Sequence, residues 1–119
     1  MKIDYRIVQK ILMAVEENDD GSEYGLSQKD LGLQEIDESI YLFHTRVLTK
    51  QKALESEREV SIAEDKPRYN PYALTDLGRE LLKEISVEGK LLKVLNYLRE
   101  TGKEITVALA VEIAKGKML

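Results

Sequence analysis

The 119-residue chain is 43% hydrophobic and 34% charged but only 6% aromatic, which suits one mainly helical domain with a core of Leu, Ile and Val. It contains no cysteine, which excludes disulfides and thiolate metal sites, and its net charge of −4 opposes strong non-specific binding to nucleic acid. No apolar run approaches the roughly 20 residues that a membrane span needs, and residues 1–18 mix acidic and basic groups, unlike a signal peptide. We therefore expect a cytoplasmic protein without a membrane partner.

Apolar residues recur at helical spacing near the N-terminus and predict a first helix at about 4–18, capped by Asp4. The members of this stripe are Ile3, Ile7, Val8, Ile11, Leu12 and Val15. After a polar loop, a very short helix is expected within 26–33. There Ser27 is placed to act as its N-cap and Gly32 to end it.

A longer helix is expected at about 35–51, because apolar side chains return at spacings of four, three and four residues. The predicted inward face consists of Ile36, Ile40, Phe43 and Val47. Two helices joined by a tight turn that contains glycine are typical of a helix-turn-helix.

The hydrophobic period then changes from helix to strand. Residues 53–62 are polar with partial alternation, which predicts a half-exposed strand. Residues 63–71 hold both prolines and turn-forming residues, which indicates a loop. A second strand is expected at Tyr69–Leu74, so that the unit forms a β-hairpin with a charged tip.

A helical pattern follows the second strand directly, and Thr75 is placed to cap it. Its predicted inward side chains are Leu77, Leu81, Leu82 and Ile85. Gly78 lies in the first turn, where glycine costs about 1 kcal/mol relative to alanine. We expect this glycine because it lets the helix backbone lie close to a neighbouring element.

Two more helices are expected at about 88–100 and 104–115, the second with small residues on one face. Two arrangements are open for them: they pair in a homodimer, or they fold back and complete the chain's own core. We prefer the homodimer, since a core this small gains stability from a partner. The residues that would form the dimer are Leu91, Leu95, Leu98, Val107 and Val111.

The expected order is helix, short helix, longer helix, two strands with a loop, and helix, which is the order of a winged helix. The stretch YALTDLGRELL resembles the L-T-x-x-G-x-x-x-L junction that ends the wing in MarR-like and PadR-like regulators. The matching positions are Leu74, Thr75, Gly78 and Leu82. Residues 5–84 also resemble the YjcQ-like winged-helix proteins, an uncharacterised group from Gram-positive bacteria and their prophages.

We therefore expect a mainly α protein with a small antiparallel β-hairpin (α+β). It consists of a winged helix-turn-helix domain at 1–86 and a C-terminal helical extension at 87–119. The resemblance implies a small transcriptional regulator that binds double-stranded DNA through the helix at 35–51 and the wing. The DNA-binding candidates are Tyr41, Thr45 and Arg46 for base edges, Lys50 and Lys52 for phosphates, and Lys66 and Arg68 on the wing.

The distribution of charge argues against DNA. Residues 1–86 hold 12 basic and 18 acidic groups, a net of −6, whereas residues 87–119 hold 6 basic and 4 acidic, a net of +2. The helix at 35–51 begins with three carboxylates, which would repel phosphates at the end that usually enters the groove. The alternative function is a winged-helix module that binds a protein partner and no DNA.

The sequence offers no chemistry beyond binding. The only histidine, His44, lies at the edge of a helical apolar face, and we interpret it as a packing residue rather than a metal ligand. The acidic stretch at 19–23 lacks the twelve-residue ligand spacing of a calcium loop. No combination of nucleophile, base and orienting group is recognisable, so we expect no enzyme, no cofactor and no metal.

Overall fold

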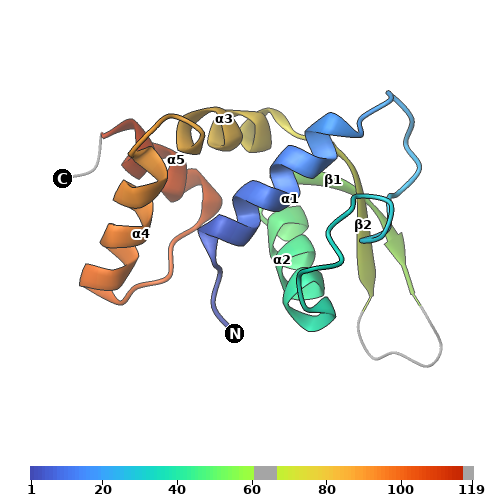
Figure 1. Cartoon of the computed structure of the whole chain (residues 1–119), viewed down its shortest axis with the longest axis horizontal. Helices are drawn as coiled ribbons and strands as arrows, with labels where there is room; N and C mark the ends of the chain where they lie inside the picture. The colour runs from blue at the N-terminus through green and yellow to red at the C-terminus, as the bar shows by residue number, and fades with distance from the viewer. Residues whose placement is uncertain (61–66, 117–119) are drawn as a thin grey trace.

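The first helix begins where the sequence predicts. In the computed structural model, which describes residues 1–60 and 67–116, α1 (Tyr5–Glu17) is capped by Asp4, whose carboxylate accepts a hydrogen bond of 2.9 Å from the amide of Arg6. One face of α1 is buried along its whole length, from Tyr5 to Val15. In Figure 1 this helix runs diagonally across the middle of the molecule, between the helices at one end and the hairpin at the other.

The segment between α1 and the next helix differs from the prediction. Residues 28–32 form hydrogen-bonded turns and no helix. The amide of Leu31 bonds the carbonyl of Ser27, and Ser27 and Asp30 exchange two hydrogen bonds of 3.0 Å each, so one helical turn begins. It stops at Gly32, where φ is +70°, because a single turn does not repay the cost of nucleating a helix. Leu31 and Leu33 nevertheless point into the core.

Helix α2 (Glu38–Lys50) is capped by Asp37 and lies against α1 and the hairpin. Its inward face is not the predicted one. The fully buried residues are Tyr41, His44, Thr45 and Leu48, whereas the expected Ile40, Phe43 and Val47 are only half-buried. The apolar pattern therefore predicted the helix correctly, but the face that is buried is shifted by about one residue along the sequence from the predicted face.

The hairpin is confirmed. Strands β1 (Leu54–Glu59) and β2 (Arg68–Leu74) pair antiparallel, from Leu54 opposite Leu74 to Glu59 opposite Arg68, with an irregularity between Glu55 and Ser56. The free edge of β2 receives one further hydrogen bond, of 2.9 Å, from the amide of Leu26 to the carbonyl of Pro71. The loop after α1 is thereby fixed to the hairpin.

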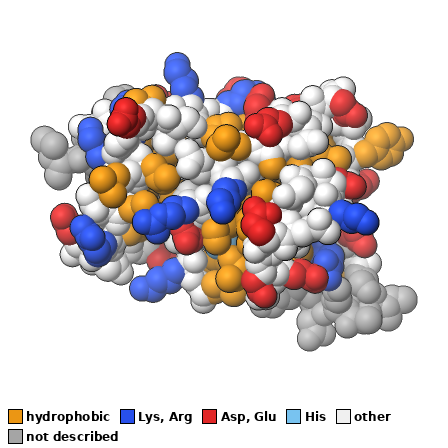
Figure 2. Space-filling view, in the orientation of Figure 1, with side chains coloured by type: hydrophobic (Ala, Val, Ile, Leu, Met, Phe, Trp, Pro, Cys, Tyr) orange, Lys and Arg blue, Asp and Glu red, His pale blue; other side chains and the backbone are white. Residues whose placement is uncertain are grey.

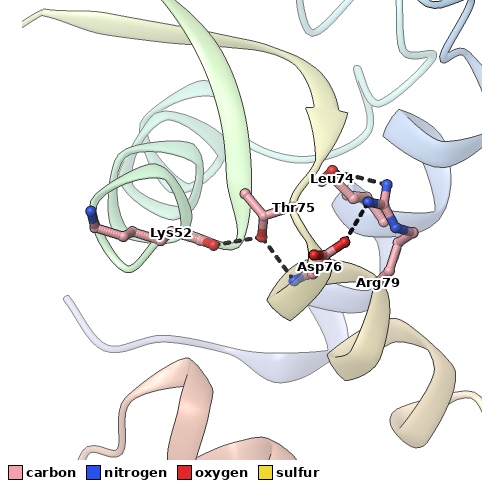
Figure 3. A network of polar contacts seen from close by, with 6 residues as sticks. Lys52, Leu74, Thr75, Asp76 and Arg79 are labelled. Atoms are coloured by element: carbon pink, nitrogen blue, oxygen red, sulfur yellow. Dashed lines mark hydrogen bonds and ion pairs between the residues drawn. The ribbon is translucent and has the colours of Figure 1, made fainter.

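The junction between β2 and α3 (Asp76–Ile85) explains Gly78. Figure 3 shows Thr75 between the end of α2 and the start of α3: its hydroxyl donates to the carbonyl of Lys52 at 2.5 Å and accepts from the amide of Gly78 at 3.0 Å. A Cβ on Gly78 would lie 2.0 Å from the carbonyl oxygen of Ala53. The expected close approach of two backbones is thus confirmed, and Ala53 is its partner.

The last two helices, α4 (Lys90–Thr101) and α5 (Val107–Lys115), complete the chain's own core. The small-residue face of α5 is buried as predicted, with Val107, Ala110, Val111 and Ala114 inside. The Tyr5 hydroxyl donates to the carbonyl of Ile105, and the Val107 amide donates to the Gln51 side chain at 2.6 Å. None of the helices in the described part of the chain has the length and apolar character required to cross a membrane.

Candidate functional site: the groove beside the hairpin

A broad groove separates the hairpin from the segment that leads into α2. It has a volume of about 1110 Å³. Its walls come from residue 25 and residues 27–30, from residues 34–38 with the first turns of α2, and from the C-terminal half of β1 and the N-terminal half of β2. We call it the wing groove. Six carboxylates line it: Asp30, Glu35, Asp37, Glu38, Glu57 and Glu59. Among the described residues of its lining, the cationic ones are Lys29 and Arg68, so this part of the groove is strongly acidic.

Backbone amides hold three of these carboxylates in place. Asp30 accepts from the amide of Ser27 at 3.0 Å, Asp37 from that of Ser39 at 3.1 Å, and Glu57 from that of Gly25 at 3.2 Å. Hydrogen bonds from Ser27 lower the pKa of Asp30, and those from Ser39 lower the pKa of Asp37. Both groups are therefore ionised at neutral pH.

Arg68, a predicted wing contact, lies in the groove but is engaged there. Its guanidinium forms an ion pair of 3.0 Å with Glu38 and so connects β2 to the first turn of α2. Two residues further along β2, the side-chain amide of Asn70 donates a hydrogen bond of 2.9 Å to the carboxylate of Glu59 on β1. Because Arg68 is compensated by Glu38, the remaining lining is dominated by carboxylates.

The prediction that Tyr41 and Thr45 lie on the outer face of α2 is wrong. Tyr41 is 2% exposed and Thr45 is 0% exposed, so neither lies on the outer face of α2. Burial of Thr45 is compatible with its polar group because its hydroxyl donates to the carbonyl of Leu42 at 3.2 Å, in its own helix. Tyr41 is one of the residues that line the wing groove.

The neighbouring His44 is buried for the same reason as Thr45. It is bonded to the Asp4 amide at 2.8 Å and to the Ile40 carbonyl at 2.7 Å. The interpretation of His44 as a packing residue is therefore confirmed.

Three other predicted DNA contacts, Arg46, Lys50 and Lys52, do not line the groove. Lys50 and Lys52 are exposed and Arg46 is half-buried, and none of the three forms an ion pair with any residue that the structure describes. Arg46 and Lys50 are one helical turn apart and so share a flank of α2. Lys66 lies outside the described residues.

The predicted dimer residues divide into two groups. Val107 and Val111 are buried within the chain, at 0% and 2% exposure, so their assignment to a dimer surface is wrong. Their side chains fill the space beside α3 and α4, which leaves them no free surface. Leu91, Leu95 and Leu98 on α4 are half-buried against the same core.

The sequence did not reveal the packing role of Gly25 or the convergence of the carboxylates in the wing groove. A Cβ on Gly25 would lie 2.5 Å from the Cβ of Asn70 and 2.9 Å from that of Glu57, so only glycine lets this loop lie against the hairpin. The sequence shows only a glycine that ends a polar loop. The carboxylates of the groove come from three separate segments, and no local spacing indicates that they converge.

Figure 2 shows the same asymmetry on the surface: Asp and Glu gather toward the hairpin end, and Lys and Arg are more numerous over the α4 end. The order of α1, the turn segment, α2, the hairpin and α3 defines a winged-helix-like α+β protein, with α4 and α5 added. Comparison of the chain with protein-family models, with curated proteins and with solved structures found no match.

Proposed function

We propose that this protein is a winged-helix interaction module whose wing groove binds a basic segment of another protein. The observation that carries the proposal is the described lining of that groove, where six carboxylates outnumber two cationic residues, one of which forms an ion pair with Glu38. A concave surface of one sign concentrates oppositely charged ligands and accelerates their association. The proposed function is binding without catalysis.

The size of the groove supports a polypeptide ligand. Its volume of about 1110 Å³ exceeds the range of roughly 300–1,000 Å³ that is usual for small-molecule pockets. A chain segment that carries several Lys or Arg residues fills such a space and supplies the missing positive charge. Duplex DNA would instead bring phosphates towards Asp37 and Glu38, which electrostatic repulsion opposes.

The test uses a fluorescein-labelled hexaarginine peptide and fluorescence anisotropy at low and moderate salt. The double variant Glu57→Gln/Glu59→Gln removes two charges from the groove and keeps a carbonyl acceptor for the hydrogen bonds from Gly25 and Asn70. We expect the wild type to bind more weakly as salt rises, and the double variant to bind about three- to tenfold more weakly than the wild type at low salt.

The matched control is Glu88→Gln/Glu100→Gln, which removes two exposed charges that do not line the groove. It changes net charge by the same amount and should bind within about twofold of the wild type, since the surface charges lie away from the ligand. Equal losses in both double variants, or no binding by the wild type, would show that the groove is not the binding site.

A second candidate function is DNA binding by a small regulator, which the resemblance to winged-helix regulators suggests. One observation favours it: Arg46, Lys50 and Lys52 are cationic residues without an ion pair in the described part of the chain. A gel shift with random duplexes at low and moderate salt tests this candidate. Arg46→Ala/Lys50→Ala should abolish retention, whereas Lys93→Ala/Arg99→Ala on α4 should not; equal retention by both variants would exclude this surface.

A further inference from the structure

Tyr41 belongs to the lining of the wing groove, and its buried hydroxyl has no hydrogen-bond partner among the described residues. The side chain is 2% exposed, and its hydroxyl forms no hydrogen bond with any residue that the structure describes. The other fully buried tyrosine, Tyr5, differs in this respect, because its hydroxyl donates to the carbonyl of Ile105 at 3.3 Å. Buried polar groups are nearly always bonded, so an unpartnered hydroxyl on a residue of a groove lining is a candidate contact for a ligand.

The surroundings of this hydroxyl define what it can bind. Burial raises the pKa of Tyr41, and the nearby charge of Asp30 adds to the effect, so the phenol stays neutral and can both donate and accept. Asp37 lies one helical turn before Tyr41, and residues four apart share a face of a helix. The charge of Asp30 thus acts on this hydroxyl, so a cation is favoured there and an anion is repelled.

We propose that Tyr41 is the recognition residue for one arginine or lysine side chain of the basic segment that the wing groove binds. The incoming N–H donates to the Tyr41 oxygen, and the charge of the same group is balanced by Asp30 and Asp37. This inference rests on the proposed function, because it names the part of the groove that selects the ligand. An arginine or lysine has several N–H donors and reaches the hydroxyl and a carboxylate together.

The decisive variant is Tyr41→Phe, which removes one oxygen atom and leaves the ring in the core. We expect it to bind hexaarginine at least about tenfold more weakly than the wild type, because it loses a hydrogen bond to a charged group. We also expect its thermal unfolding temperature to be equal to or higher than that of the wild type, since the lost hydroxyl has no partner in the free protein.

Tyr5→Phe is the matched control, with the same chemical change at an equally buried tyrosine outside the wing groove. It should unfold at a lower temperature than the wild type and bind hexaarginine with unchanged affinity, because it loses an internal hydrogen bond and no ligand contact. Wild-type affinity in Tyr41→Phe would overturn this inference and leave the proposed function intact. Failure of the wild type to bind hexaarginine would overturn both.

Discussion

At the scale of single residues, Gly78 shows how one missing side chain fixes the position of a helix. The Ala53 carbonyl that a Cβ would meet at 2.0 Å also accepts a hydrogen bond of 3.1 Å from the Thr75 amide, so it cannot move aside freely. Alanine would gain about 1 kcal/mol of helix propensity at this position, but the steric conflict with fixed backbone outweighs that gain.

We therefore predict that Gly78→Ala lowers the free energy of unfolding by about 2–3 kcal/mol, as measured by urea denaturation. Lys83→Ala, an exposed change in the same helix, serves as the control and should stay within about 0.5 kcal/mol of the wild type. A Gly78→Ala protein as stable as the wild type would mean that α3 can shift away from Ala53 at little cost.

At the scale of elements, the start of α1 is joined to α2 by a histidine that must be neutral. The His44 Nδ1–H donates to the Ile40 carbonyl at 2.7 Å, and the Nε2 accepts from the Asp4 amide at 2.8 Å. A proton on Nε2 would face the Asp4 N–H and remove that acceptor. Burial lowers the pKa of His44, against smaller opposing effects of the Ile40 hydrogen bond and the Asp4 charge.

This arrangement predicts a loss of stability in mild acid. The folded-state pKa lies below the ordinary value of 6.5, so the unfolded chain binds the proton first as pH falls. The free energy of unfolding should therefore be fully preserved above about pH 7 and should decrease below about pH 6.5, with a slope of at most about 1.4 kcal/mol per pH unit. Urea denaturation between about pH 7.5 and pH 5.5 measures it, and His44→Gln should show a much flatter profile.

The same helix shows what sequence alone can and cannot predict. The bounds of α1, the presence of the hairpin and the start of α3 followed from caps, alternation and periodicity, which are local signals. The rotation of α2 did not, because burial of His44 and Thr45 depends on hydrogen bonds, one of them to Asp4, forty positions earlier in the chain. The wing groove could not be predicted from the sequence for a related reason, because its carboxylates form one surface only after the chain has folded.

At the scale of the whole molecule, the N-terminal and C-terminal parts share one core. The N-terminus of α5 is bonded to Gln51 at the end of α2, and Lys115 forms an ion pair with Glu80 on α3. Val111 is 2% exposed within this shared core, whereas Leu92 on α4 is 56% exposed. Because the buried apolar cluster runs through α1, α3, α4 and α5, opening of one part exposes apolar surface of the other.

We predict that the amides of α1 and α5 exchange hydrogen through the same global opening and that Val111→Ala lowers the protection of both helices equally. The expected loss is about 2 kcal/mol in each, because two buried methyl groups are removed and the cavity is only partly filled. Hydrogen exchange followed by NMR measures both helices in one sample, with Leu92→Ala as the exposed control.

If Val111→Ala lowered the protection of α5 alone while α1 kept its wild-type protection, residues 87–116 would form a separate folding unit that packs on the winged helix. Equal losses in α1 and α5 would instead mean that one core supports both the wing groove and the last helix. A substitution in α5 would then lower the stability of the wing groove, which lies at the other end of the molecule in Figure 1.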